Sequence, residues 1–166
     1  MYANEIMSVD VKSCTRDANL EEISRLMWDC DCGAVPVVNQ KGKPIGIVTD
    51  RDIAMAAMLN HKPLWEMAAA ALIEGQRLCT CEQEETVESC LHKMEQYGVR
   101  RLPVVDAGGR LCGIITMGDV LAFAAKPAVS RSKTQDKQVP VSNLMAMLKN
   151  VSGHHAQASQ SVEMAS

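Results

Sequence analysis

The sequence has few aromatic residues, no long apolar run and no large excess of charge. Phe, Trp and Tyr make up 3% of the 166 residues, and the longest uncharged apolar run, 67–73, is far too short to cross a bilayer. The net charge of −3 lacks the basic excess that binds nucleic acid. The first residues lack the basic and apolar pattern of a signal peptide. We therefore expect a cytoplasmic protein with neither membrane nor nucleic acid as its partner.

The cysteines do not form the pattern of a disulfide framework or of a zinc site. There are seven, an odd number, and no signal peptide accompanies them, which favours reduced thiols. The pairs Cys30/Cys32 and Cys79/Cys81 are spaced more closely than zinc ligands usually are. The four histidines share no ligand spacing either. We therefore expect no metal site.

One stretch of the chain occurs twice. Residues 36–53 return as residues 103–120, shifted by 67 positions without a gap, and 8 of these 18 positions are identical. Both copies keep two glycines and a Thr-x-x-Asp. This pattern indicates a tandem duplication. Each half alone would bury too little apolar surface to be stable, so we expect the halves to pack against each other.

Each half is predicted to begin with a capped amphipathic helix. Asn19 can accept a hydrogen bond from the first turn, and Glu22 stands where a capping box has its acid. Thr86 is predicted to begin the equivalent helix. The expected buried faces consist of apolar residues at helical spacing. They are Leu20, Ile23, Leu26, Met27 and Cys30 in the first half, and Val87, Cys90, Leu91, Met94 and Tyr97 in the second.

A β-hairpin and a second helix are predicted to follow in each half. Short runs rich in β-branched residues, 35–38 and 102–105, each precede a polar turn and a return strand. Pro36 and Pro103 cannot donate to a strand ladder, so each marks an edge, a strand start or a bulge.

The domain boundaries follow from this pattern of helices and hairpins. We assign 1–60 to the first repeat, 61–78 to a connecting segment with a short helix, 79–125 to the second repeat, and 126–166 to a basic linker, a short amphipathic helix (142–151) and a disordered tail.

The end of each return strand carries the pattern Gly-h-h-Thr-x-x-Asp, where h is apolar. One interpretation is structural, with Thr49 and Thr116 as helix caps and Asp52 and Asp119 as capping-box acids. The other is functional. A helix N-terminus offers free N–H groups to a phosphate, and an aspartate one turn later offers acceptors to the hydroxyls of a ribose. The spacing alone leaves both interpretations open.

Taken together, these motifs resemble a tandem of cystathionine beta-synthase (CBS) domains, the unit called a Bateman module. The resemblance covers residues 1–125 and is carried by 35–38 with 46–52, and by 101–106 with 113–119. It implies a mixed α/β (α+β) fold of two β-α-β-β-α repeats, packed about a pseudo-twofold axis with two clefts between them.

The resemblance also implies a ligand and the residues that bind it. Family members often bind AMP, ADP, ATP or S-adenosylmethionine in these clefts. Carried onto this chain, the nucleotide-binding residues are Thr49, Arg51, Asp52, Thr116 and Asp119 for phosphate and ribose, with Val35, Leu102, Cys14, Thr15, Thr80 and Cys81 near the base. Arg51 has the counterpart Gly118, so the clefts should differ. The first should be the better site for a multiply phosphorylated ligand.

The expected function is that of a non-enzymatic regulatory sensor, because no catalytic triad or other catalytic constellation is visible. The module would form a homodimer and signal occupancy by an adenosine-containing ligand to a regulated protein whose identity the sequence does not give. No cofactor is required. The alternative is a ligand-independent dimerisation or scaffold protein, in which Thr-x-x-Asp is only a cap and the helix at 142–151 docks the partner.

Overall fold

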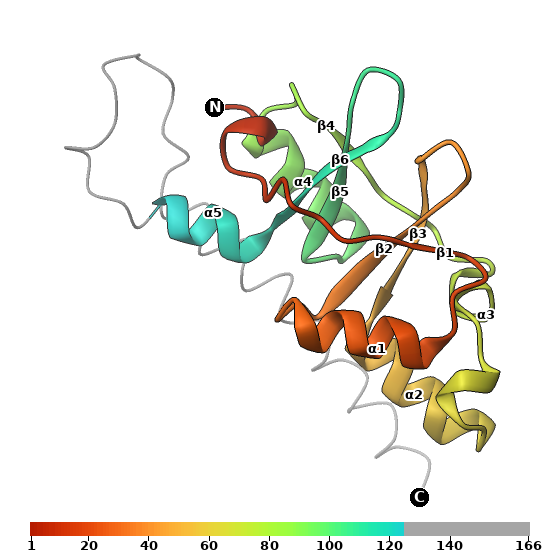
Figure 1. The fold of residues 1–166 in the computed structure, drawn as a ribbon. Coiled ribbons are helices and arrows are strands. Elements are labelled where there is room, and N and C mark those ends of the chain that lie inside the picture. The colour runs from red at the N-terminus through yellow and green to blue at the C-terminus, as the bar shows by residue number, and fades with distance from the viewer. Residues whose placement is uncertain (125–166) are drawn as a thin grey trace, which may run out of the picture.

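The protein folds into two similar halves, each built on a three-stranded sheet (Figure 1). The structure is a computed structural model and describes residues 1–124. Strand orders are β1-β2-β3 and β4-β5-β6. The elements are η1 (Ala3–Glu5), β1 (Cys14–Thr15), α1 (Leu20–Asp29), β2 (Ala34–Val38), β3 (Pro44–Thr49), α2 (Asp50–Asn60), η2 (Leu64–Glu66), α3 (Ala69–Ile73), β4 (Cys81–Glu82), α4 (Val87–Tyr97), β5 (Arg101–Val105), β6 (Leu111–Thr116) and α5 (Met117–Ala124). This confirms the α+β class. The expected linker, helix and tail in 126–166 lie outside the described residues.

The predicted first helices begin at the predicted caps. The side chain of Asn19 accepts from the backbone N–H of Glu22 at 2.9 Å, and Glu22 completes the capping box. Thr86 accepts from Ser89 N–H at 3.2 Å. The prediction for Cys30 was wrong. Helix α1 ends at Asp29, and Cys30 is exposed because the chain turns at Asp31, which takes a φ of 49°.

Both hairpins form as predicted, with matching register. Strand β2 pairs antiparallel with β3 and parallel with the two-residue β1, and β5 pairs likewise with β6 and β4. Pro36 lies opposite Ile47, just outside the pairing with β1, and the register shifts between Val37 and Val38. The proline therefore interrupts no pairing to β1, as expected for a position beside a bulge.

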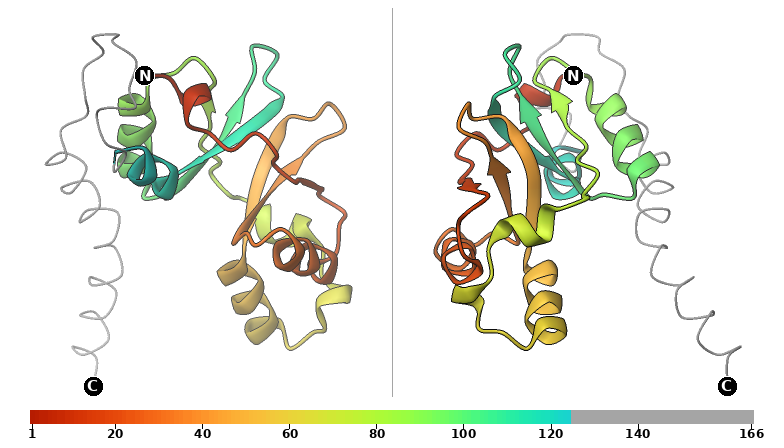
Figure 2. Two further views of the ribbon diagram at one scale, coloured as in Figure 1. Left: turned by 60° about the vertical axis from the view of Figure 1, so that its left-hand side comes forward. Right: turned by 90° about the vertical axis from the view of Figure 1, so that its right-hand side faces the viewer.

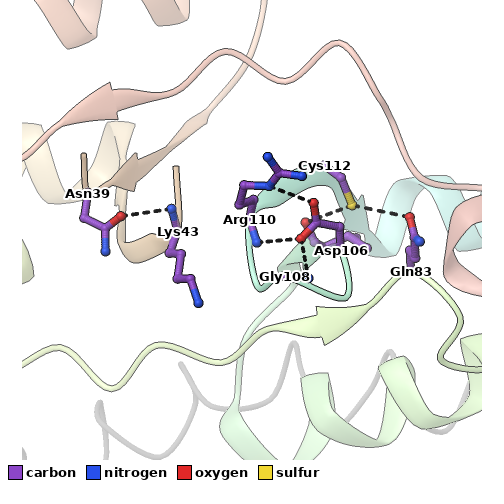
Figure 3. A network of polar contacts seen from close by, with 8 residues as sticks. Asn39, Lys43, Gln83, Asp106, Gly108, Arg110 and Cys112 are labelled. Atoms are coloured by element: carbon purple, nitrogen blue, oxygen red, sulfur yellow. Dashed lines mark hydrogen bonds and ion pairs between the residues drawn. The ribbon is translucent and has the colours of Figure 1, made fainter. Parts of the chain in front are cut away.

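The two hairpin turns lie side by side at one end of the molecule (Figures 2 and 3). In the first turn, Asn39 Oδ1 accepts from Lys43 N–H at 3.1 Å. In the second, Asp106 Oδ1 accepts from Arg110 N–H at 2.9 Å. The halves join here, because Leu111 N–H donates to the carbonyl of Gly42 at 2.9 Å.

The halves also exchange their entering segments. The N-terminal segment packs on the second half, where Ala3 N–H donates to Glu85 O at 2.8 Å (Figure 1). The connecting segment packs on the first half, where Ala69 N–H donates to Ala18 O at 2.9 Å. Each half is thus completed by the chain that leads into the other, which explains how two small cores hold together.

The contacts of two equivalent glycines show how tightly these segments fit. A side chain at Gly46 of β3 would collide with Ile73 of α3. A side chain at Gly113 of β6 would collide with Met7 of the N-terminal segment. Because each glycine lets an entering segment lie directly against a strand, the repeated Gly is a packing requirement in both halves.

Candidate functional site

The two Thr-x-x-Asp motifs fold into the same cap. Thr49 Oγ1 donates to Asp52 Oδ2 at 2.7 Å and accepts from Asp52 N–H at 3.1 Å. Thr116 Oγ1 donates to Asp119 Oδ2 at 2.7 Å and accepts from Asp119 N–H at 3.2 Å. The structural interpretation of the motif is therefore correct. Because the cap uses Oδ2 of each aspartate and does not engage Oδ1, it leaves an acceptor for another group.

A cavity of about 580 Å³ opens beside the second motif. It lies where β6 ends and α5 begins, and the turn after α1 and the N-terminal segment form its other walls. Its lining residues are Ser8, Asp10, Val11, Lys12, Cys30, Asp31, Cys32, Gly33, Ala34, Arg100, Arg101, Ile114, Thr116, Met117, Gly118 and Asp119. Both halves therefore contribute to one concave site of the size that small ligands occupy.

The wall of the cavity carries charges of both signs. Lys12, Arg100 and Arg101 supply cations, and three aspartates, at positions 10, 31 and 119, supply anions. Lys12 Nζ lies 2.8 Å from Asp10 Oδ1. This hydrogen bond and the attraction of the Asp10 charge raise the pKa of Lys12 above its usual value. The site thus has donors for an anionic group and acceptors for hydroxyls.

The two motifs differ at the second residue after the threonine. Arg51 is exposed in the first turn of α2. Its counterpart Gly118 lines the cavity, and a Cβ atom there would meet only Thr116 Oγ1, at 3.4 Å. The second motif therefore has open space where the first has a guanidinium. The cations of the second cleft come from Lys12, Arg100 and Arg101 instead.

Two of the residues expected near the base, Val35 and Leu102, lie in the two cores. Both are fully buried, one in each core, and neither lines the cavity. The residues just before them, Ala34 and Arg101, line the cavity.

The entering-strand residues do not line this cavity. Cys14 is half-buried, and burial raises the pKa of its thiol to about 11. Thr15 lines a separate cavity of about 660 Å³ beside the first hairpin turn. The carbonyl of Thr80 accepts from Lys93 Nζ at 3.1 Å. Cys81 is buried in the second core.

Sequence reasoning missed the contributions of Asp10, Lys12 and Arg100 to the cavity. No pattern in the sequence showed that the N-terminal segment crosses over to Arg100 and Arg101. The signal that could have found them is their position, directly before the repeated apolar-Pro motif at the start of β5.

Within residues 1–124, no group of three or more His, Cys, Asp or Glu side chains is arranged to hold a metal ion. The same part of the chain contains no helix that is both long and apolar enough to span a membrane.

Comparison with known families agrees with the fold and the repeated motif. The family model described as "CBS domain" matches residues 3–59 and 76–126. The chain belongs to the CBS domain family. Because the model matches twice, this is a tandem CBS pair, as the resemblance implied.

Relatives of the CBS pair occur both as small proteins and within larger enzymes. An uncharacterised protein of Bacillus subtilis, YlbB, is 34% identical over 70% of this chain and 77% of its own length. A protein of Methanopyrus kandleri, MK0525, is 35% identical, and the matched region spans 59% of its length. A homoserine O-acetyltransferase of Methanohalobium evestigatum is 28% identical over 72% of this chain, which corresponds to only 23% of the enzyme.

Two solved structures that are similar to this chain contain adenosine ligands. The CBS domain pair of protein MJ0100, in complex with 5′-methylthioadenosine and S-adenosyl-L-methionine, is 26% identical and aligns with a TM-score of 0.63 over 74% of this chain and 94% of its own. The cytosolic domain of the Mg²⁺ channel MgtE, in complex with ATP, is 25% identical, with a TM-score of 0.60 over 74% of this chain and 48% of its own.

Proposed function

We propose that this CBS pair is a non-enzymatic regulatory module that binds an adenosine-containing ligand in the cleft beside Thr116 and Asp119. Occupancy of the cleft is signalled to a regulated protein. The observation that carries the proposal is the cavity of about 580 Å³ at this motif, which brings a helix N-terminus, an aspartate and three cations together. The ligands of MJ0100 and MgtE support the adenosine class.

The chemistry of the wall matches the parts of a nucleotide. The Oδ1 atom of Asp119 is outside the cap and can accept from a ribose hydroxyl. The N-terminus of α5 and the cations Lys12, Arg100 and Arg101 can bind phosphate. This distribution favours the second cleft for a phosphorylated ligand and replaces the sequence-based preference for the first.

The residues of the first cleft, Thr49, Arg51 and Asp52, belong to the same proposal as a second, non-equivalent site. Ligand in a cleft touches both halves, since the second cleft is lined by both. A ligand that binds one arrangement of the halves more tightly shifts the population toward it, and this differential affinity is what a partner would detect.

Isothermal titration calorimetry with AMP, ADP, ATP and S-adenosylmethionine tests the proposal. Asp119→Ala should abolish most of the binding, while Asp52→Ala is the matched control, because it removes an equivalent cap from the other half. Both variants should lose similar stability, about 0.3–1 kcal/mol for an acid in the first turn of a helix. If none of the four compounds binds the wild-type protein, the proposal is wrong.

We propose further that the chain forms a homodimer through the outer face of α1, α2 and η2. This face exposes apolar side chains that an isolated chain would leave in water. They are Trp28 (87% exposed), Met55 (42%), Met58 (52%), Leu59 (67%) and Trp65 (63%). The same surface would serve the alternative, a ligand-independent dimerisation or scaffold protein. Sedimentation equilibrium of Met58→Lys, with Lys41→Glu at an exposed turn position as control, should show that only the first variant weakens self-association.

A further inference from the structure

The two halves differ in how the return strand is bonded to the segment that crosses it. In the second half, Ser8 satisfies both backbone groups of Ile114. Its N–H donates to Ile114 O at 2.9 Å, and its carbonyl accepts from Ile114 N–H at 3.0 Å. In the first half, the residue equivalent to Ile114 is Ile47, and a side chain makes both of the corresponding hydrogen bonds. Gln76 Oε1 accepts from Ile47 N–H at 2.8 Å, and Gln76 Nε2 donates to Ile47 O at 2.9 Å.

The residue after Gln76 makes the next difference. The guanidinium carbon of Arg77 lies 4.7 Å from the ring centre of Tyr97, which is within the range of a cation–π interaction. Tyr97 is the last residue of α4. Its equivalent in the first half, 67 positions earlier, is Cys30, which directly follows α1. Cys30 lines the open second cavity. Tyr97 therefore stands at the corresponding wall of the first cleft.

Arg77 also corresponds to a lining residue of the second cavity. Strands β1 and β4 begin 67 positions apart, at Cys14 and Cys81, and the same shift makes Arg77 the equivalent of Asp10. Asp10 lines the open cavity. Where the second cleft is bordered by a small thiol and an acidic side chain, the repeat places a stacked arginine and tyrosine at the first.

We propose that Arg77 and Tyr97 control access to the first cleft, which their stacking holds closed to an adenosine ligand. An entering ligand must separate the guanidinium from the ring, and this cost lowers the affinity of the first cleft. The second cleft carries no such pair and fills first. The inference rests on the proposed function, and it adds two residues that select which cleft is occupied.

Titration calorimetry of the full chain with AMP tests this in the Asp119→Ala background, where the first cleft is the one measured. Replacing Arg77 by Met should raise the affinity of that cleft for AMP about 2- to 5-fold, the value of an exposed cation–π contact. Tyr97→Leu should act in the same direction, and the double variant should gain no more than either alone. In the Asp52→Ala background, Arg77→Met should leave AMP binding to the second cleft unchanged.

Two outcomes of the titration overturn the inference. If Arg77→Met weakens AMP binding to the first cleft, Arg77 is a phosphate ligand and not a barrier. If the affinity does not change, the stacked pair has no bearing on access. Arg25→Met, which removes an exposed arginine paired with Glu21 on α1, is the control for the loss of charge alone.

A ligand-free measurement separates this inference from the proposed function. In nuclear magnetic resonance spectra, the side-chain protons of Arg77 should be shifted upfield by the Tyr97 ring and should return to ordinary positions in Tyr97→Leu. Unshifted Arg77 signals in the wild type would overturn the closed first cleft. Shifted signals together with no AMP binding by the wild type would overturn the proposed ligand and leave the stacked pair established.

Discussion

Replacing Gly46 by alanine should test the exchange of entering segments between the halves. The new Cβ would lie 2.7 Å from the Cβ of Ile73 and closer still to Cγ2 of that residue. Ile73 is branched at Cβ and sits on α3, so it cannot turn away. Overpacking of this kind costs about 1–3 kcal/mol, and removing a glycine from a strand returns about 0.5–1 kcal/mol. We expect a net loss of about 1–2 kcal/mol.

The equivalent change in the other half is the matched control. At Gly113 the nearest side-chain atoms are Sδ and Cγ of Met7, an unbranched thioether that can change rotamer. Gly113→Ala should therefore cost less than Gly46→Ala in urea unfolding followed by circular dichroism, with the m-value unchanged. Ile73→Ala combined with Gly46→Ala should be less destabilising than the sum of the two. Equal costs at both glycines, or strict additivity, would refute the crossing of α3 over β3.

Two further predictions concern ionisation and thiol reactivity. Burial raises the pKa of Glu85, but hydrogen bonds from Lys93 and Ser89 outweigh it and hold that pKa below its usual 4.5. The ionised carboxylate therefore stabilises the fold above about pH 4.5, and this stability is lost as the pH falls through the folded-state pKa. Glu85→Gln should flatten the acid limb of a plot of melting temperature against pH. The same substitution at the exposed Glu88 should not. With Ellman's reagent, the exposed Cys30 should react first, and the buried Cys90 should react only on unfolding. A fast phase that is still present in Cys30→Ser would contradict the assignment of the fast phase to Cys30.

Local signals in the sequence were enough to predict the helices and the hairpin of each repeat. Asn19, Thr49 and Thr86 were each predicted to begin a helix, and each is an N-cap in the structure. The reason is that a cap and a short run of β-branched residues are each encoded within a few neighbouring residues. The end of α1 was missed because Asp31 takes a left-handed conformation that glycine would have signalled and aspartate does not.

The composition of the site could be predicted only in part. Thr116 and Asp119 were found because they repeat Thr49 and Asp52. Lys12 was not, since it reaches the cavity through the crossing of the N-terminal segment, a long-range arrangement that no local pattern encodes. The connecting segment likewise places Gln76 against β3 of the first half and Arg77 over Tyr97 of α4, and these contacts make the two clefts different.

The central claim is that an adenosine ligand occupies the cleft formed by both halves at the N-terminus of α5. A crystal structure of the full chain grown with AMP tests it most directly. We predict density beside Thr116 and Asp119, with the ribose at the Asp119 carboxylate and the phosphate near Lys12, Arg100 or Arg101. A cleft that stays empty of AMP at saturating concentration would contradict the account.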